Sequence, residues 1–398
     1  MVKKLNFSNF IVFYLIISTG ALSLGKNESL IVGLFTVFLF ANYIIKKKKI
    51  IFTRKSLIIL LFTFFCILFS TLINIASFEG GATNFILGFS LKIINAILVI
   101  NLLSFDTFII KYIKQIFVLS SFSLFFYFTL LVYPGLINFL PKLPSTDPYQ
   151  YNFLIYVYET PRFSVFPRNM SIFYEPGVFQ GLIVIAVLFL KFLNINTKKL
   201  YKYYFVFLIS LLTTFSTTAY ICIIGIILIT LKEFKNSKLI YVVLIILMSF
   251  SFSLGLFNIV LQNKLQDPTS NISSLRRLTD VQIETKMFLE KPFFGYGYDY
   301  FTVKKQELDK SDSVEVWTGS TNSITYHLAL FGILFMTPIF VGYYILIKQI
   351  DKGFVNQIIL YFIIIIVLMG ETFLQKMLFL VLCYYPFGLL NQRKKSIN

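Results

Sequence analysis

An arginine and a glutamate, Arg168 and Glu175, stand just before an apolar segment that is long enough to cross a membrane. Charged side chains at the mouth of a membrane helix are costly unless they are paired or used in chemistry. The glutamate could act as a general base, and the arginine could pair with it or hold a substrate phosphate. Arg162 is a weaker candidate for the same phosphate. The structural alternative is that Pro176 suits a first helical turn and that the helix dipole favours a carboxylate before it.

Two more arginines, Arg276 and Arg277, fall in the first turn of a helix that we expect over Ser274–Glu290. Apolar residues recur near one face of this segment, and Pro292 ends it. Arginines in a first turn oppose the helix dipole, at a cost of a few tenths of a kcal/mol each. A helix N-terminus that also carries two guanidiniums is an anion site. The two interpretations are a diphosphate clamp and an anchor for lipid headgroups.

Polar residues also occur in and before other apolar segments. Asn322, in the run Ser320–Ser323, could hydrogen-bond a sugar hydroxyl or cap the helix that follows. Lys92 stands near the middle of an apolar segment. Because a charged side chain within a membrane span is costly, we treat this lysine as a functional candidate. Its partner could be a ligand phosphate, or it could be a buried, hydrogen-bonded lysine or one that extends to the interface. His327, the single histidine, is interpreted as a packed side chain and not as a catalytic one.

The segments that must position these residues are membrane helices. The chain of 398 residues is 57% hydrophobic, 18% aromatic and 14% charged, which is typical of an all-α polytopic membrane protein. Because each crossing needs roughly 20 apolar residues, we expect about twelve spans in a single integral membrane domain over 1–398. The expected spans are Phe7–Leu24, Leu30–Ile45, Leu57–Ile75, Phe85–Leu103, Ile116–Gly135, Gly177–Leu193, Tyr203–Phe215, Thr217–Leu231, Leu239–Ile259, Ile324–Ile347, Gln357–Phe373 and Met377–Leu390.

The segment Tyr203–Leu231 has a length that suits one long helix or two short ones. Basic residues flank both ends, which favours an even number of crossings. Phe215–Thr218 offers a polar break between two short helices.

The net charge of +18 comes from short basic clusters between apolar runs. That pattern orients helices with basic loops in the cytoplasm, and it argues against nucleic acid as a partner. It predicts that both termini are cytoplasmic and that two long loops, 136–174 and 261–323, lie outside. The three cysteines lie in apolar runs without metal-binding spacing, and there is one histidine. We therefore expect free buried thiols, no cofactor and chemistry that needs no metal.

Four motifs in this order resemble the O-antigen and capsule polymerase family (Wzy-type), within the larger O-antigen ligase-like superfamily. They are Arg168 with Ser171–Gly177 (Ser-Ile-Phe-Tyr-Glu-Pro-Gly), Leu212–Ala219, Arg277 through Pro292–Gly297 (Pro-Phe-Phe-Gly-Tyr-Gly), and Ser320–Ser323 with Gly332. The resemblance covers the whole topology of many spans and two large outer loops that each carry an arginine. In one respect the chain departs from the ligase branch, because Thr321 stands where that branch has a histidine. The departure favours polymerase over ligase and argues against a histidine-based mechanism.

The resemblance implies a multi-pass glycosyltransferase of the cytoplasmic (inner) membrane. It would polymerise undecaprenyl-diphosphate-linked oligosaccharide repeats into O-antigen or capsular polysaccharide at the outer face. The partners that it implies are this substrate and the lipid bilayer, with a chain-length regulator as a further candidate. Glu175 would be the base, and Arg168 and Arg277 would stabilise the departing diphosphate. The expected substrate-binding residues are Arg162, Arg276, Asn322, Lys92 and Tyr174. The alternatives are a ligase that moves finished glycan to another acceptor and a flippase or other transporter of lipid-linked oligosaccharide.

Overall fold

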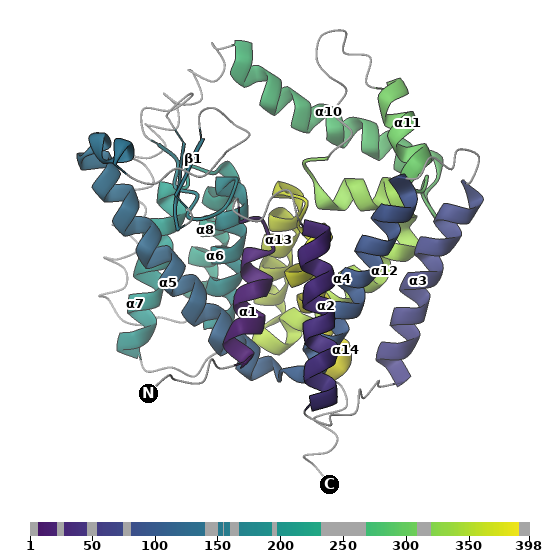
Figure 1. Ribbon diagram of the computed structural model, residues 1–398, viewed down its shortest axis with the longest axis horizontal. Helices are drawn as coiled ribbons and strands as arrows, with labels where there is room; N and C mark the ends of the chain where they lie inside the picture. The colour runs from purple at the N-terminus through teal and green to yellow at the C-terminus, as the bar shows by residue number, and fades with distance from the viewer. Residues whose placement is uncertain are drawn as a thin grey trace. The chain divides into compact units, whose positions relative to one another are not determined.

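The protein is built from α-helices, with one short hairpin of strands, in a computed structural model (Figure 1). The structure describes residues 7–21, 28–45, 54–74, 81–139, 150–153, 155–159, 167–192, 197–231, 268–308 and 320–389. The expected span at Leu239–Ile259 lies outside these ranges. The all-α class is confirmed, and the number of membrane crossings stays a prediction.

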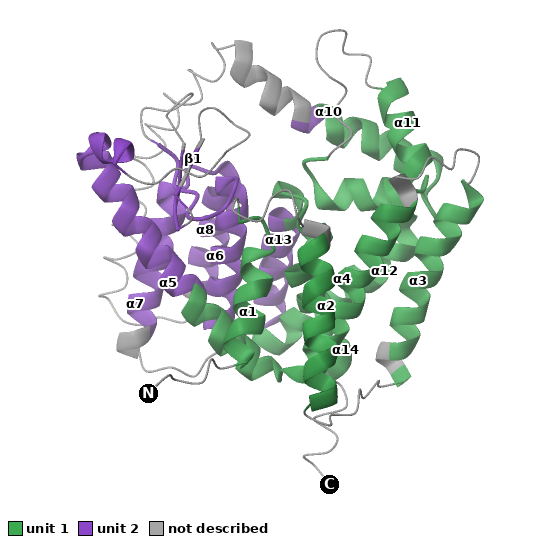
Figure 2. Cartoon of the chain, in the orientation of Figure 1, with its two compact units in different colours: residues 1–115, 279–352, 368–398 green, residues 116–278, 353–367 purple. Residues whose placement is uncertain are grey.

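The described elements divide between two compact units (Figure 2). Unit 1 comprises residues 1–115, 279–352 and 368–398, and unit 2 comprises residues 116–278 and 353–367. The helices and turns that begin in unit 1 are α1 (Phe7–Ile17), α2 (Glu28–Ile45), α3 (Arg54–Ile73), α4 (Gly81–Leu102), α5 (Phe105–Val132), α11 (Tyr298–Leu308), α12 (Ser323–Ile350), the 3-10 turn η4 (Phe373–Gln375) and α14 (Met377–Leu389). Those that begin in unit 2 are the 3-10 turn η3 (Pro134–Asn138), β1 (Gln150–Asn152), β2 (Val157–Glu159), α6 (Pro176–Leu190), α7 (Thr197–Thr213), α8 (Thr217–Leu231), α10 (Pro268–Glu290) and α13 (Phe354–Gly370).

Three of the described helices are long and apolar enough to cross a membrane: Thr83–Leu102 within α4, all of α5, and α12. Eight shorter apolar helices accompany them. Helix α5 begins at Phe105, well before the expected start at Ile116. Lys111 and Lys114 interrupt the apolar run there, and hydrophobicity alone therefore placed the start of the helix too late.

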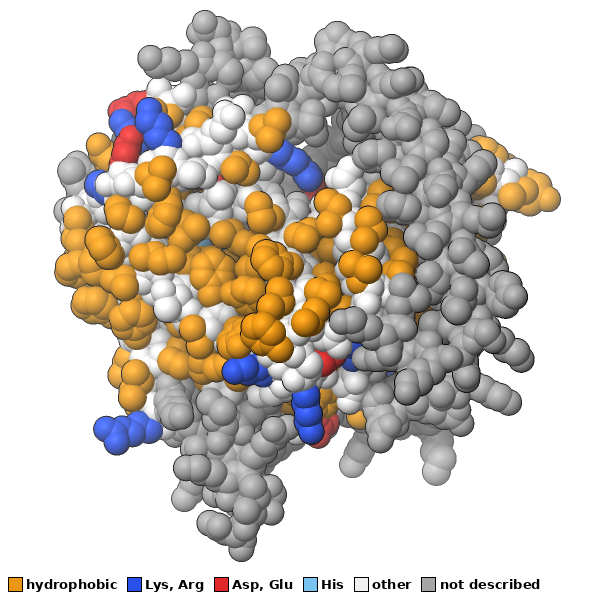
Figure 3. Space-filling view, turned by 180° about the vertical axis from the view of Figure 1, so that it is seen from behind, with side chains coloured by type: hydrophobic (Ala, Val, Ile, Leu, Met, Phe, Trp, Pro, Cys, Tyr) orange, Lys and Arg blue, Asp and Glu red, His pale blue; other side chains and the backbone are white. Residues whose placement is uncertain are grey.

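Helix α3, one of the shorter apolar helices, has an exposed apolar face. Its large apolar side chains recur at helical spacing and remain exposed, with Leu61 at 59%, Phe65 at 51% and Leu72 at 60%. Figure 3 shows hydrophobic side chains gathered over a broad area of one face, with the charged side chains in view near the edges of that area. A soluble protein rarely exposes so much contiguous apolar surface, and this surface therefore indicates a bilayer.

A polar break separates α7 from α8, as the Phe-Ser-Thr-Thr sequence predicts. Phe215 has a left-handed φ of 49°, which is uncommon for a residue with a large side chain. The break frees the backbone carbonyls of Thr213 and Thr214 from helical hydrogen bonds. The backbone amide of Asn169 donates to the Thr213 carbonyl at 3.0 Å, and Arg168 Nε donates to the Thr214 carbonyl at 3.4 Å. The helix break therefore provides the docking point for the loop that precedes α6.

A second break lies within α12, at Gly332, whose φ of 76° and ψ of 179° are allowed almost only for glycine. The break frees backbone groups on both sides, and the Pro292–Gly297 segment pairs with them. The amides of Tyr296 and Gly297 donate to the carbonyls of Ala329 and Leu330, both at 2.9 Å. In return, the amide of Ile333 donates to the Pro292 carbonyl at 2.8 Å. The Gly-Tyr-Gly motif is therefore a backbone partner for a broken helix, and not merely a turn after α10.

Candidate functional site

The loop that carries Arg168 and Glu175 is held in unit 2 by Asn169, a fully buried residue. Its side-chain Nδ2 donates to Thr213 Oγ1 at 3.0 Å, and its Oδ1 accepts from the backbone amide of Ser171 at 3.2 Å and from the Ser123 hydroxyl. Ser171 adopts a left-handed φ of 55° directly before the site. Buried amides are stable in such positions only when their polar atoms are satisfied. Asn169 therefore fixes the loop between α5 and the end of α7.

Glu175 occupies the N-cap position of α6, but its side chain makes no capping hydrogen bond. Its carboxylate Oε2 lies 3.9 Å from Nη2 of Arg277, which comes from α10. The side chains are 44% and 47% exposed, respectively, so the pair is open to solvent. The structure thus brings together two of the three predicted catalytic residues, Glu175 directly after the first long loop and Arg277 in the second. Arg168, the third, is half-buried on the same loop as Glu175.

This geometry suits general-base chemistry beside an anionic leaving group. An exposed carboxylate that is not committed to capping can accept a proton, and a half-exposed guanidinium can bind two oxygens of a phosphate. The N-terminus of α6 adds a positive dipole end beside the carboxylate. A pair separated by 3.9 Å in solvent contributes little to stability, so a ligand could separate its partners at small cost.

Asn322 lies in unit 1 and caps α12. Its side chain accepts hydrogen bonds from the backbone amides of Ile324 at 2.8 Å and Thr325 at 3.3 Å, and the residue is 2% exposed. The sequence allowed Asn322 to cap a helix or to bind a sugar hydroxyl, and the structure shows the capping hydrogen bonds. A contact between Asn322 and a sugar hydroxyl stays a prediction.

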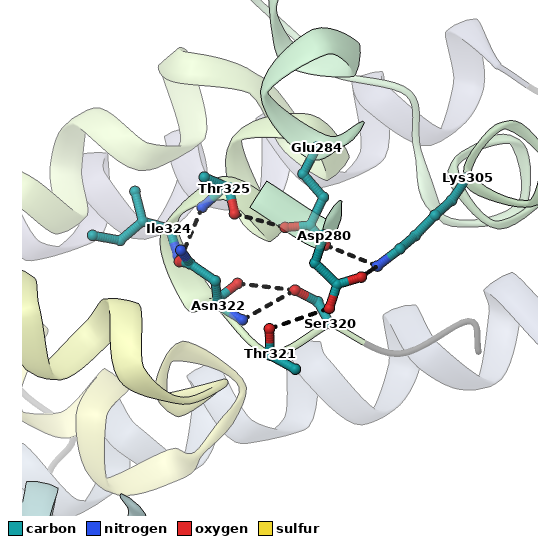
Figure 4. A network of polar contacts seen from close by, with 8 residues as sticks. All are labelled: Asp280, Glu284, Lys305, Ser320, Thr321, Asn322, Ile324 and Thr325. Carbon is teal, nitrogen blue, oxygen red and sulfur yellow. Dashed lines mark hydrogen bonds and ion pairs between the residues drawn. The ribbon is translucent and has the colours of Figure 1, made fainter. Parts of the chain in front are cut away.

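A buried charge network lies beside this cap (Figure 4). Lys305 Nζ, on α11, contacts Asp280 Oδ1 at 2.8 Å and Glu284 Oε1 at 3.0 Å, both on α10. The second oxygens of the two carboxylates accept hydrogen bonds from Thr321 at 3.1 Å and Thr325 at 2.6 Å. Burial raises the pKa of the Glu284 carboxyl, and the Lys305 ammonium and the hydroxyl donors act in the opposite direction.

Sequence reasoning missed this network. Apolar periodicity predicts that Leu278 and Leu289 face the protein, but both are exposed, while Asp280 and Glu284 are buried. A sequence pattern alone places acidic residues on the polar face, because charged side chains are seldom buried. The available signal was their spacing of four residues, which is shared with the apolar pair Ile283 and Met287. A mixed apolar and acidic stripe indicates a buried cation partner.

The other predicted binding residues are spread over the chain. Tyr174, half-buried, immediately precedes Glu175, and Lys92 is half-buried in α4 of unit 1. Arg162 lies outside the described residues, as does the side chain of Arg276. His327 is fully buried, with Nδ1 2.6 Å from the Ser323 carbonyl oxygen and its ring among aromatic side chains, as expected of a packed histidine. In the part of the chain that the structure describes, no three His, Cys, Asp or Glu side chains gather to hold a metal ion.

Comparison with known families gives one match, to the family described as O-Antigen ligase, over residues 178–340. The matched segment includes Arg277, the Lys305 network and both helix breaks, and it begins just after Glu175. The match supports the O-antigen ligase-like superfamily and implies a membrane glycan-processing enzyme of the O-antigen ligase type. It does not separate a polymerase from a ligase. No curated protein matches the chain.

Proposed function

We propose that this protein is a membrane glycosyltransferase that joins undecaprenyl-diphosphate-linked oligosaccharide repeats into a polysaccharide at the outer face of the cytoplasmic membrane. The observation that carries the proposal is the half-exposed Glu175–Arg277 pair, which joins the residue directly after the first predicted outer loop to the second such loop. The superfamily match supports glycan transfer in a membrane. The short basic clusters between apolar runs support an orientation with these clusters in the cytoplasm.

In the proposed reaction, a hydroxyl at the nonreducing end of a new repeat attacks the anomeric carbon of the growing chain. A new carbon–oxygen bond forms while the bond from that carbon to the diphosphate breaks. Glu175 takes the hydroxyl proton, a role that typically contributes about 10²–10⁴-fold to the rate. Arg277 and Arg168 stabilise the negative charge that develops on undecaprenyl diphosphate. Arginine suits this task because its guanidinium binds two oxygens at once.

Two observations favour polymerase over ligase. Thr321 stands at the position where the ligase branch has a histidine, and its hydroxyl is committed to Asp280. The single histidine, His327, is fully buried among aromatic rings and packs as a core residue. In this proposal, Glu175 is the remaining candidate base, and the Glu-Pro-Gly motif that carries it is a feature of the polymerase resemblance.

The test is deletion of the gene and complementation, followed by gel analysis of surface and lipid-linked glycan. We expect the deletion strain to carry a single repeat at the surface without a ladder, and the wild-type gene to restore the ladder. Full-length polymer that remains on its lipid carrier would instead identify a ligase. Unpolymerised repeat confined to the cytoplasmic face would identify a flippase, and an unchanged glycan would overturn the proposal.

Variants of the pair test the site itself at matched expression. Glu175→Gln keeps the shape of the side chain and removes its basicity, and Arg277→Lys keeps the charge and removes the bidentate fork. We expect both to lose most of the ladder. Glu307→Gln is the matched control, because Glu307 forms an ion pair with Lys304 of its own helix at 3.0 Å and is not among the predicted site residues. A normal ladder from Glu175→Gln would exclude the base role.

A further inference from the structure

Two large apolar side chains at the end of α10 are exposed, Leu289 at 69% and Phe293 at 63%. A single exposed leucine or phenylalanine is common on a soluble protein, so exposure by itself does not identify a partner. These two residues differ from that case because of their place in unit 1. The chain around them is fixed to the end of α3, the helix whose apolar face is exposed along its length.

Side chains bind the end of α10 to the end of α3. Lys291, which follows α10 directly, donates through Nζ to Asn74 Oδ1 at 2.6 Å. Asn74 Nδ2 donates in turn to the Gly295 carbonyl at 3.3 Å. The ring of Phe294 lies 4.4 Å from the ring of Phe69, measured between centroids. The segment that follows α10 therefore lies level with the last turn of α3.

Helix α3 gives the depth of this junction in a membrane. The helix has 20 residues and begins with Arg54 and Lys55, which belong to a basic cluster predicted to be cytoplasmic. At about 1.5 Å per residue, its length matches the roughly 30 Å hydrocarbon core of a bilayer. Asn74, the first residue after the helix, therefore lies at the outer boundary of that core, and the end of α10 lies at the same level.

The exposed apolar face of α3 continues to this junction. Leu68, Leu72 and Ile73, near its outer end, are 54%, 60% and 55% exposed. Phe293 and Leu289 extend the same kind of surface past the end of the helix, on the segment that Asn74 holds there. Because this surface is continuous with one that faces the bilayer, lipid is favoured over a protein partner as its occupant.

We propose that the end of α10 is a membrane anchor for the second long loop, in which Leu289 and Phe293 insert among lipid acyl chains at the outer boundary of the bilayer. Lys286, which is exposed, and Lys291, which is half-buried, extend their ammonium groups to the lipid headgroups. This contact holds the loop against the lipid surface. The inference goes beyond the proposed function, because it does not depend on the reaction that the protein catalyses.

The test measures tryptophan fluorescence of the full-length protein in phosphatidylcholine vesicles whose acyl chains carry bromine, a quencher, at shallow or at deep carbons. Trp317, the single native tryptophan, is first changed to phenylalanine. Leu289→Trp and Phe293→Trp are then made separately. Because an interfacial apolar face lies about 5–10 Å into the boundary between headgroups and acyl chains, we expect both to lose more fluorescence to shallow bromine than to deep bromine.

Two control positions calibrate the depth. Phe65→Trp, near the middle of α3 on its exposed face, should lose more fluorescence to deep bromine. Glu307→Trp, at a charged and exposed position, should lose fluorescence to iodide dissolved in the water and not to bromine. The thermal midpoint of each variant reports on its folding. Since the two anchor positions are separate and exposed, either one decides the test if the other variant does not fold.

Three results would overturn the inference. Loss of fluorescence to iodide but not to bromine would mean that the end of α10 lies in water. Loss to neither quencher would mean that protein covers the surface, such as a second copy of the chain. If undecaprenyl phosphate added to the vesicles relieved the quenching by bromine, the surface would be a site for the polyprenyl carrier and not for the bilayer.

Discussion

Both units contain a broken helix, and in each the break docks a segment of one of the two long loops predicted from the sequence. In unit 2 the break between α7 and α8 receives the loop with Arg168 and Glu175. In unit 1 the break at Gly332 receives the Pro292–Gly297 segment that follows α10. In each case the loop satisfies backbone groups that a continuous helix would have paired internally.

The two breaks differ in whether backbone groups or side chains of the docked segment make the contacts. At Gly332 the contacts are backbone to backbone, and close approach is possible because glycines lack a side chain. At Thr213–Ser216, side chains of Asn169 and Arg168 make part of the contact. The first break should therefore be sensitive to added atoms, and the second to removed hydrogen bonds. Four substitutions test that distinction, in order of their expected effect on the free energy of unfolding.

Gly332→Ala should have the largest effect. A Cβ at position 332 would lie 2.2 Å from the Phe293 carbonyl oxygen, a backbone atom that cannot move without breaking the pairing. The backbone conformation alone costs roughly 1–3 kcal/mol for a residue other than glycine, and overpacking adds roughly 1–3 kcal/mol. We expect little folded protein by size-exclusion chromatography in detergent. Gly88→Ala on α4 is the matched control, because its Cβ meets nothing within 4 Å; equal losses from both variants would mean that the break tolerates a side chain.

Asn169→Ala should come second. The change leaves the Ser171 amide and the Ser123 hydroxyl without the acceptor that they share, and each unsatisfied buried group costs about 1–3 kcal/mol. We expect a clearly lower thermal midpoint in detergent and an enzyme that loses activity through loop displacement. Asn42→Ala is the control, because the Asn42 amide donates only to the Phe38 carbonyl of its own helix. An Asn169→Ala protein as stable as the control would show that the loop is held by other contacts.

The sequence predicts the break between α7 and α8 but not the break within α12. Phe215–Thr218 was identified as a polar interruption because hydroxyl side chains and a short apolar length signal a helix end, and the structure has two helices there. The break at Gly332 was not predicted, since a single glycine in an apolar run is compatible with a continuous helix. What identifies the break is the backbone pairing with Pro292, Tyr296 and Gly297, more than thirty residues away, which local periodicity does not contain.

The same limit applies to the candidate site. Arg168, Glu175 and Arg277 were selected because charge is costly in an apolar chain, and the structure places Glu175 beside Arg277. Asn169 was overlooked because a neutral amide between charged residues carries no such signal. Lys305 was overlooked because α11 is polar, and a lysine there is ordinarily solvated. The free-energy cost of a charge in an apolar chain identifies exposed charged residues as functional candidates. The buried polar residues around them are revealed only by tertiary contacts.

Thr213→Val should have a smaller effect. Valine keeps the shape and removes the hydroxyl that accepts from Asn169, while the backbone contact from the Asn169 amide to the Thr213 carbonyl remains. The variant also loses the hydrogen bond from this hydroxyl to the Ser210 carbonyl, and the control below loses a bond of the same kind. The difference between the two is therefore one buried hydrogen bond, about 1 kcal/mol. The expected result is a small drop in thermal midpoint compared with Thr71→Val, whose hydroxyl only donates back to the Ile67 carbonyl. A drop as large as that of Asn169→Ala would mean that the side-chain contact, not the backbone contact, fixes the loop.

Arg168→Lys should change stability least and is the most informative about function. Its Nε donates to the Thr214 carbonyl at 3.4 Å, a long hydrogen bond on a half-buried side chain, so losing it should cost less than about 1 kcal/mol. Lysine retains the positive charge but loses the planar fork that can bind the docking carbonyl and a phosphate together. We expect near-normal thermal stability with polymer synthesis reduced about tenfold or more, as for loss of a transition-state contact. Equal, small losses in both measurements would make Arg168 a docking residue alone, and the chemistry of this loop would then rest on Glu175.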